Sequence, residues 1–186
     1  MPTFSSRLDT KSANFQKNKT AMLEMTEMME KLSLEASQGG GEEATQRLRS
    51  RGKLPIRERI SLLLDPDSPF LEISALAAWR SPFNIGSGFV VGIGVIEGIE
   101  CLILGHDPSV RAGAFNNFNM KKLMRGLEIA RENRLPYIQF VESAGADLRG
   151  ETGEDPEAAI KREEDHFGES GRLFYEITEL SKLRIP

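Results

Sequence analysis

The sequence has few of the residues on which several classes of protein depend. Cysteine occurs once in 186 residues, at Cys101, so no disulfide and no cysteine-based metal site can form within one chain. This scarcity is typical of proteins in a reducing compartment. Cys101 lies in the apolar stretch ECLIL, which predicts a small buried side chain.

An excess of basic residues and a long apolar run are also missing. Lysine and arginine number 24 against 28 acidic residues, a net charge of −4, which argues against a nucleic-acid partner. No run approaches the roughly 20 residues of a membrane span, so we expect no membrane partner. Residues 1–20 are polar, with four cations and no apolar core, which argues against a secretory signal. We expect a cytoplasmic protein, with a transit peptide and the mitochondrial matrix as the alternative.

Histidine occurs twice, and neither position predicts a metal site. His106 precedes Asp107-Pro108 and is expected in a turn. His166 lies in EEDHFGE, beside acidic residues, but its spacing matches no known ligand motif. We expect a structural or solvated role for it, and no metal in this chain.

The glycine-rich stretch near residue 90 predicts a β-hairpin. Residues 89–97 alternate, so that Phe89, Val91, Ile93 and Val95 share one face and Gly92 and Gly94 lie on the other, where another backbone can approach closely. A turn at Gly98 leads to a second strand, ECLILG. No helix follows the glycines and no GK[ST] is present, which excludes a dinucleotide or phosphate loop.

Four segments carry helical patterns. Residues 16–37 end at a triple glycine and are followed by a charged segment, EEATQRLRSRGKL. Pro55 is predicted as the first residue of a short helix, and residues 119–133 form a third helix with Asn119 as its N-cap. A fourth spans about 169–184, and its ending, LSKLRIP, predicts a strand to follow. The expected buried faces are Met22, Met25, Met29 and Leu32; Ile56, Ile60, Leu63 and Leu64; Leu123, Leu127 and Ala130; and Leu173, Ile177 and Leu180.

The first of these helices has two interpretations. Its methionines are typical of an adaptable binding surface. We expect instead that the helix packs on its own domain or on a neighbouring subunit. No internal repeat is found in the sequence.

The most informative segment is residues 136–149, PYIQFVESAGADLR. Residues 137–141 predict a buried strand that ends in the small residues Ser143, Ala144, Gly145 and Ala146. Gly145 can adopt positive φ, and amide N–H groups exposed at such a turn are what a developing oxyanion requires. A plain strand-to-helix turn fits the same residues.

Side chains near this turn make a weaker case for chemistry. A nucleophile elbow would require glycine two residues before Ser143, where Val141 stands. Glu142 and Asp147 could act as acid and base, but we expect an ion pair for the first and a helix cap for the second.

Lys121 and Lys122 lie in the first turn of a predicted helix, where the helix dipole disfavours cations. A phosphate-bearing ligand shared with the helix N-terminus would explain the pair. Solvated lysines are the alternative.

Three stretches in series resemble the carboxyltransferase (beta) subunits of biotin-dependent acyl-CoA carboxylases of the propionyl-, methylcrotonyl- and geranyl-CoA type. They are GKLPIRERISLLLDPDSPFLEI (52–73), KKLMRGLEIARENRLPYIQFVESAGADLR (121–149) and HFGESGRLFYEITELSKLRIP (166–186). The resemblance implies an α/β, crotonase-like fold, a superhelix of repeated ββα units. It divides the chain into a helical extension, residues 1–50, and part of a carboxyltransferase N-terminal domain, residues 51–186.

The resemblance also implies a ligase reaction in which CO2 passes from carboxybiotin to the α- or γ-carbon of an acyl-CoA thioester. Main-chain groups at Gly145 and Ala146 would contact the thioester oxygen, Ser143 and Ala144 would line the acyl-CoA, and Lys121 and Lys122 would meet the phosphates of coenzyme A. The cofactor would be biotin on a biotin carboxylase or biotin carrier (alpha) subunit. Further beta subunits would complete a homo-oligomer.

Departures from the family pattern leave alternatives open. Family members continue for several hundred residues, through a second oxyanion turn and a second domain, so we expect this chain alone to be inactive. SAGAD stands where SGGA is common, and the acidic segment Glu151–Asp165 is longer than in many relatives. A non-catalytic truncated subunit or assembly module is the second hypothesis. An acyl-CoA hydratase or hydrolase using Glu142 or Asp147 is the third.

Overall fold

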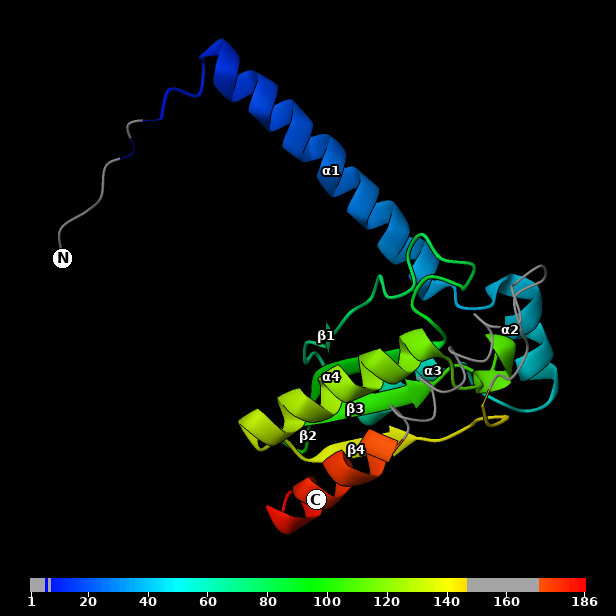
Figure 1. Ribbon diagram of the computed structural model, residues 1–186. Coiled ribbons are helices and arrows are strands. Elements are labelled where there is room, and N and C mark those ends of the chain that lie inside the picture. The colour runs from blue at the N-terminus through cyan, green and yellow to red at the C-terminus, as the bar shows by residue number, and fades with distance from the viewer. Residues whose placement is uncertain (1–5, 7, 147–170) are drawn as a thin grey trace, which may run out of the picture.

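The computed structural model describes residues 6, 8–146 and 171–186. Figure 1 shows a mixed α/β body from which the first helix projects. In chain order the elements are α1 (Ala13–Ser37), α2 (Gly41–Ser50), α3 (Ile56–Leu63), β1 (Leu71–Glu72), β2 (Phe89–Ile96), β3 (Ile99–His106), the 3-10 turn η1 (Arg111–Gly113), α4 (Asn117–Asn133) and β4 (Tyr137–Phe140). Residues 171–182 form a further helix.

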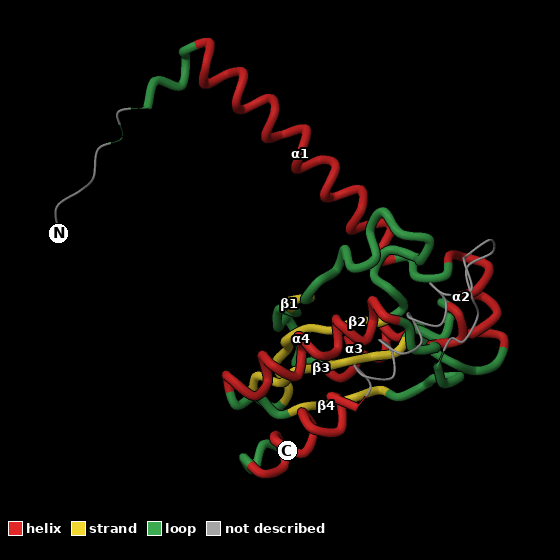
Figure 2. Tube along the Cα trace, in the orientation of Figure 1, coloured by secondary structure: helices red, strands yellow, loops and turns green. Residues whose placement is uncertain are grey.

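The strands form one sheet in the order β1-β2-β3-β4 (Figure 2). β1–β2 and β2–β3 are antiparallel, whereas β3–β4 is parallel. The predicted hairpin is confirmed: β2 and β3 pair from Phe89 opposite His106 to Ile96 opposite Ile99. The parallel pair places the carboxyl ends of β3 and β4 at the same edge of the sheet.

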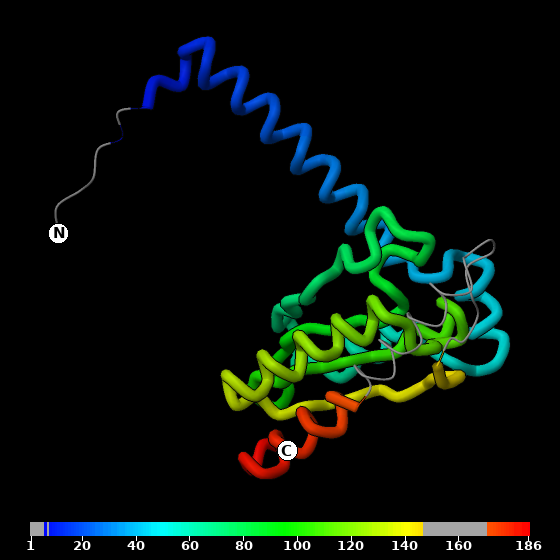
Figure 3. Tube along the Cα trace, in the orientation of Figure 1, coloured from blue at the N-terminus to red at the C-terminus, as the bar shows by residue number. Residues whose placement is uncertain are grey.

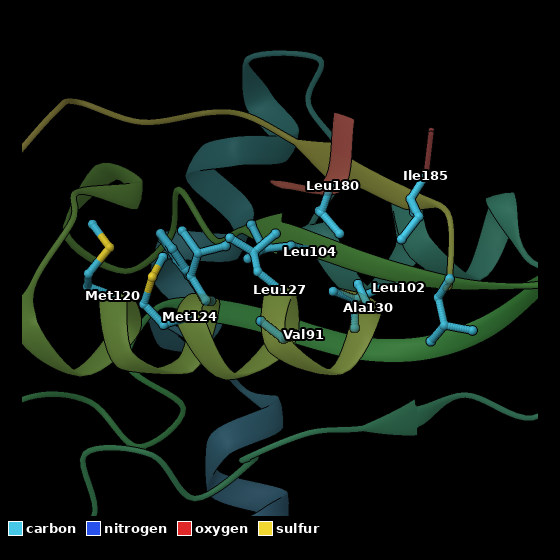
Figure 4. Close-up of a cluster of buried hydrophobic side chains, with 12 residues drawn as sticks. Val91, Leu102, Leu104, Met120, Met124, Leu127, Ala130, Leu180 and Ile185 are labelled. Carbon is cyan, nitrogen blue, oxygen red and sulfur yellow. The ribbon is translucent and has the colours of Figure 1, made fainter. Parts of the chain in front are cut away.

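Both faces of the sheet are covered. On one face, α4 packs Leu123, Leu127 and Ala130 against β2 and β3, and all three side chains are fully buried, as predicted. Figure 4 shows Leu127 and Ala130 in this cluster. Leu180 and Ile185 extend this cluster. On the other face, α3 packs Ile56 and Ile60 against Val90, Cys101 and Ile103. The predicted burial of Cys101 is therefore confirmed, and this burial raises the pKa of its thiol.

The two glycines of β2 allow the close approach that the sequence predicts. A Cβ at Gly92 would overlap the Phe70 ring and would lie 2.7 Å from the Leu71 carbonyl oxygen. A Cβ at Gly94 would overlap a methyl group of Leu64. These positions let the Phe70 ring and Leu64, at the end of α3, pack directly on the sheet.

The helix α1 does not pack as expected. Figures 1 and 3 show it extending away from the body, and Met22, Met25 and Met29 are 59–61% exposed. Ala36, at its last turn, is the one buried residue of this helix. The expectation that the stripe packs on its own domain is therefore wrong for the described residues. No helix in the described ranges is long and apolar enough to cross a membrane.

The charged segment after the triple glycine, for which no structure was predicted, forms α2. Acidic residues, Glu42 and Glu43, occupy its first turn and basic residues, Arg47 and Arg49, its last turn. This arrangement complements the helix dipole at both ends.

Two boundaries and one buried position differ from prediction. The N-cap of α4 is Asn116, whose side chain accepts from the Phe118 and Asn119 amides, while the Asn119 side chain accepts from the Asn116 amide in return. β4 ends at Phe140 and is half-buried, and Val141 beyond it is 67% exposed. Ile177 is 41% exposed rather than buried, because the helix of residues 171–182 meets the body mainly through Leu180 and Glu176.

Candidate active site

The turn of Ser143 to Ala146 lies beyond the carboxyl end of β4 and is held by the segment that follows β3. The Ala144 N–H donates to the Ala112 carbonyl oxygen over 3.1 Å, and the Phe115 N–H donates to the Gly145 carbonyl oxygen over 2.8 Å. Phe115 and Ala146 form an isolated parallel bridge. Residues 112–115 therefore fix the backbone of the turn on both sides of Ala144.

The turn has the backbone that the sequence predicts. Gly145 has φ +94°, a conformation that disfavours any residue with a Cβ. A Cβ there would meet no atom within 4 Å, so the requirement for glycine is conformational rather than one of space. Ala144, Gly145 and Ala146 are all exposed.

The amide groups of the turn differ in availability. The Gly145 N–H donates to the Ser143 hydroxyl oxygen over 3.1 Å. The Ala146 N–H meets no acceptor among the residues that the structure describes. An exposed, oriented N–H of this kind is suited to a ligand oxygen on which negative charge develops.

The segment supporting the turn has a strained backbone. Arg111, Ala112 and Gly113 all lie in the left-handed region, with φ of 47°, 53° and 68°. For residues with a Cβ, this conformation costs about 1–2 kcal/mol each. A Cβ at Gly113 would overlap the Glu142 carbonyl oxygen, so this glycine lets the segment lie against the chain leading into the turn.

Glu142 has the structural role expected for it. Its carboxylate accepts from the Lys53 ammonium and, over 3.2 Å, from the Arg59 guanidinium, which also lies over the Phe140 ring. These contacts tie the entry of the turn to α3 and the chain before it. Asp147, the acidic segment Glu151–Asp165 and His166 lie outside the described residues.

The two lysines of α4 do not act as a pair. Because α4 begins at Asn117, both fall in its second turn rather than its first, which corrects the prediction. Lys121 is exposed and lines a pocket of about 230 Å³ with Arg125, Glu128 and Arg172.

Lys122 is buried instead of facing a ligand. Its ammonium donates to the Phe89 carbonyl oxygen over 2.7 Å and lies 3.7 Å from the Glu72 carboxylate, which also pairs with Arg57. Burial lowers the pKa of Lys122 to about 8, although Glu72 opposes this shift. This ammonium is committed to the interior, so the structure does not place it where a phosphate could meet it.

The sequence argument missed His106. This residue is not in a turn but ends β3, fully buried, with its ring 4.2 Å from that of Phe89. The signal was present, since Leu102, Leu104 and His106 share one face of the strand by alternation. In the described ranges, no group of three His, Cys, Asp or Glu side chains is arranged to hold a metal ion.

Comparison with known proteins identifies the family. The family model of the carboxyl transferase domain matches residues 47–186. A probable biotin-dependent acyl-coenzyme A carboxylase beta2 subunit of Mycobacterium tuberculosis is 45% identical over 148 residues, covering 80% of this chain and 26% of that protein. The probable mitochondrial methylcrotonoyl-CoA carboxylase beta chain of Drosophila melanogaster is 40% identical over 185 residues, covering 97% and 30%.

Comparison with solved structures identifies the same family. The beta subunit of geranyl-CoA carboxylase from P. aeruginosa superposes with a TM-score of 0.72 at 37% identity, covering 79% of this chain and 28% of that one. The transcarboxylase 12S core, described as a hexamer with methylmalonyl-coenzyme A bound, gives 0.71 at 26% identity, covering 86% and 30%. The chain thus spans less than a third of the length of these relatives. It belongs to the carboxyl transferase domain family and has the crotonase-like α/β fold of that family's beta subunits.

Proposed function

We propose that this chain forms an acyl-CoA-binding part of a biotin-dependent carboxyltransferase, which moves CO2 from carboxybiotin to the α- or γ-carbon of an acyl-CoA thioester. The observation that carries the proposal is the exposed turn at Gly145 and Ala146, whose backbone is fixed by residues 112–115. Membership of the carboxyl transferase family supports it, because the relatives are named as biotin-dependent acyl-CoA carboxylase beta subunits.

The chemistry explains why a main-chain donor suffices. Loss of a proton next to a thioester carbonyl moves negative charge onto the carbonyl oxygen, and an N–H already aimed at that oxygen stabilises the charge without reorganisation. The Ala146 N–H would serve as this donor, and Ser143 would orient the Gly145 amide beside it. When bound, carboxybiotin would supply the CO2, and the biotin left after its release would take up the proton. Glu142, neutralised by two cations, is not required as a base.

Lys121 is the lysine that we assign to the coenzyme A phosphates. It lies on α4 in a pocket with two arginines and one glutamate, a set with a net positive charge. Lys122 supports the site indirectly, by holding α4 against β1 and β2.

The assembly follows from the same proposal. The partner would be an alpha subunit that carries biotin carboxylase and the biotin carrier, and other beta subunits would complete an oligomer. The relatives' names support both, since they are beta subunits and one solved neighbour is described as a hexamer. The domain boundary near residue 50 and a cytoplasmic or mitochondrial location remain part of this proposal.

A second candidate is a non-catalytic assembly module, and the exposed stripe of α1 favours it. Co-purification with a biotin carboxylase subunit without any CO2 transfer would support this candidate over the first. For a hydratase or hydrolase, Glu142 is disfavoured as the acid or base because its carboxylate is held by Lys53 and Arg59, while Asp147 lies outside the described residues.

The test of the proposed function compares two glycines with positive φ and open space around the missing Cβ, Gly145 and Gly98. Each is replaced by alanine in the protein that carries this sequence, assembled with its biotin-bearing partner, and transfer of labelled CO2 to acyl-CoA is measured. Gly145→Ala should lower kcat roughly 100-fold, the effect of losing one oxyanion donor. Gly98→Ala, in the distant hairpin turn, should leave kcat unchanged. Equal kcat values in the two variants would reject the turn as the site.

A further inference from the structure

A buried histidine lies beneath the segment that holds the turn. The His106 side chain is fully buried at the end of β3. Its ring stacks on Phe89 at 4.2 Å and 27°, and it meets Phe115 nearly at right angles, with ring centroids 5.0 Å apart. Packing on two aromatic rings fixes the plane of the imidazole. Phe115 is also the residue whose N–H binds the Gly145 carbonyl oxygen.

A short hydrogen-bond chain from β4 determines how the imidazole is protonated. The Tyr137 hydroxyl donates to Gln139 Oε1 over 2.9 Å, and Gln139 Nε2 lies 3.0 Å from His106 Nε2. An amide nitrogen can only donate, so His106 Nε2 accepts and the ring proton lies on Nδ1. Burial lowers the pKa of His106, so its ring stays neutral.

The His106 side chain packs against the strained turn. Its Nδ1 is buried and has no hydrogen-bond partner among the residues that the structure describes, so His106 meets this segment by packing alone. A Cβ at Gly113 would lie 3.4 Å from the His106 Cβ and would overlap the Glu142 carbonyl oxygen. Gly113 is thus confined between His106 and the chain leading into the turn.

The strain in this segment calls for such support. Consecutive left-handed residues persist only where their surroundings determine the backbone fully. Ala112, inside the strained turn, accepts from the Ala144 N–H, and Phe115, just beyond it, donates to the Gly145 carbonyl. A shift of residues 111–115 would therefore move the amides at positions 144–146.

We propose that His106 is a positioning residue for the turn at Gly145 and Ala146. The neutral ring, oriented by Gln139 and packed on Phe89, supports Phe115, and the His106 Cβ lies close to Gly113. The segment supported in this way carries the two backbone groups that bind the turn, the Ala112 carbonyl and the Phe115 N–H. This inference rests on the proposed function for its catalytic consequence, but its structural part stands independently.

The structural part is tested by NMR on the 186-residue chain. Imidazole 15N shifts should show His106 as the neutral tautomer protonated at Nδ1 at pH 7. In Gln139→Glu, a carboxylate of the same shape makes Nε2 a donor, and the amide resonances of Ala144 and Ala146 should shift. Gln46→Glu, the same change on the surface of α2, should leave both amides in place. An Nε2-protonated ring, or amides that do not move in Gln139→Glu, would overturn the inference.

The catalytic part is tested in the assembled carboxylase. Gln139→Glu should lower kcat roughly 10- to 100-fold, the effect of a small misplacement of a reacting group, with KM for acyl-CoA within about twofold. Tyr137→Phe, which removes only the hydroxyl that orients Gln139, should give a smaller loss of kcat of the same kind and guards against misfolding of the first variant. A loss of stability with kcat intact in both variants would reduce His106 to a packing residue. Absence of CO2 transfer in the unmodified enzyme would reject the proposed function and leave the NMR result standing.

Discussion

The chain passes from a helix into an extended segment twice by the same device, once at Arg134-Leu135-Pro136 and once at Arg184-Ile185-Pro186. Both arginines have φ 55°. In each case the next amide donates back to the helix, from Leu135 to Ala130 and from Ile185 to Leu180. The proline carbonyl then accepts from a strand: Pro136 from Leu102 of β3, and Pro186 from Tyr137 of β4.

The helices before the two passages differ in packing. α4 buries Leu123, Leu127 and Ala130 completely, whereas the helix of residues 171–182 leaves Phe174, Tyr175 and Ile177 41–73% exposed. A pocket of about 420 Å³, lined in part by Tyr137 and Ile177, lies where this second helix meets β4.

The comparison separates local from tertiary determinants. A left-handed arginine followed by an apolar residue and proline is sufficient to end a helix and direct the chain onto the neighbouring strand. How deeply the helix is buried depends instead on how much sheet lies beneath it. The repeat escapes detection in the sequence because only three residues at each passage are alike.

The largest difference in stability should come from apolar side chains at matched truncations in the two helices. Leu127→Ala, at a fully buried position, should lower the free energy of unfolding by about 2–5 kcal/mol. Ile177→Ala, at an exposed position of the other helix, should change it by no more than about 0.5 kcal/mol. Urea titration followed by circular dichroism measures both. Similar losses would show that the second helix is packed as tightly as α4.

The buried Lys122 should make α4 respond to pH in a way that the second helix does not. Its pKa in the folded protein is about 8, below the value of roughly 10.4 in an unfolded chain. The unfolded state therefore binds more protons between these values, and stability should rise with pH there, on the order of 2 kcal/mol from pH 7 to pH 9.5. In Lys122→Met this rise should vanish, and an unchanged pH dependence would contradict the burial.

The second helix has its own buried charge, Glu176, whose carboxylate lies 3.2 Å from Arg131 of α4. Glu176→Gln should lower the free energy of unfolding by about 1–2 kcal/mol. The loss is limited because Arg131 and Arg172, which pair with Glu176, are partly exposed and can be hydrated in the variant. Hydrogen exchange should accelerate in residues 171–182 while α4 stays protected. Equal acceleration in both helices would mean that they unfold as one unit.

The smallest effect should come from the left-handed arginine that the two passages share, Arg134 and Arg184. Glycine relieves left-handed strain, so Arg184→Gly should stabilise the protein by about 0.5–1 kcal/mol. Arg134→Gly should gain less, because the Arg134 side chain donates to the Leu183 carbonyl oxygen over 3.1 Å. Thermal unfolding of both variants gives the comparison, and a larger gain at position 134 would contradict it.

Much of the fold followed from the sequence because alternation and helical periodicity report local faces. The hairpin, the buried face of α4, the role of Gly92 and the left-handed Gly145 were all predictable in this way. The exposure of α1 was not, because an apolar stripe does not specify what covers it. The charged residues of α2 concealed a helix that buries Leu48 and carries complementary charges at its two ends.

The site was only partly predictable for a related reason. The small residues of the turn are visible in the sequence, but the segment that grips it, Ala112 to Phe115, is about 30 residues away along the chain. Lys122 resembles Lys121 in sequence and differs only in which side of α4 it occupies. His106 becomes meaningful only when Gln139, on the parallel strand β4, lies beside it.

The most direct measurement is a titration of the 15N-labelled chain with an acyl-CoA thioester, followed through the backbone amides. The account predicts that the resonances of Gly145 and Ala146 shift with added thioester and that the Gly98 amide does not. In Gly145→Ala the shift at Ala146 should disappear. Thioester binding that moves other resonances and leaves Gly145 and Ala146 unchanged would contradict the claim that this turn receives the thioester oxygen.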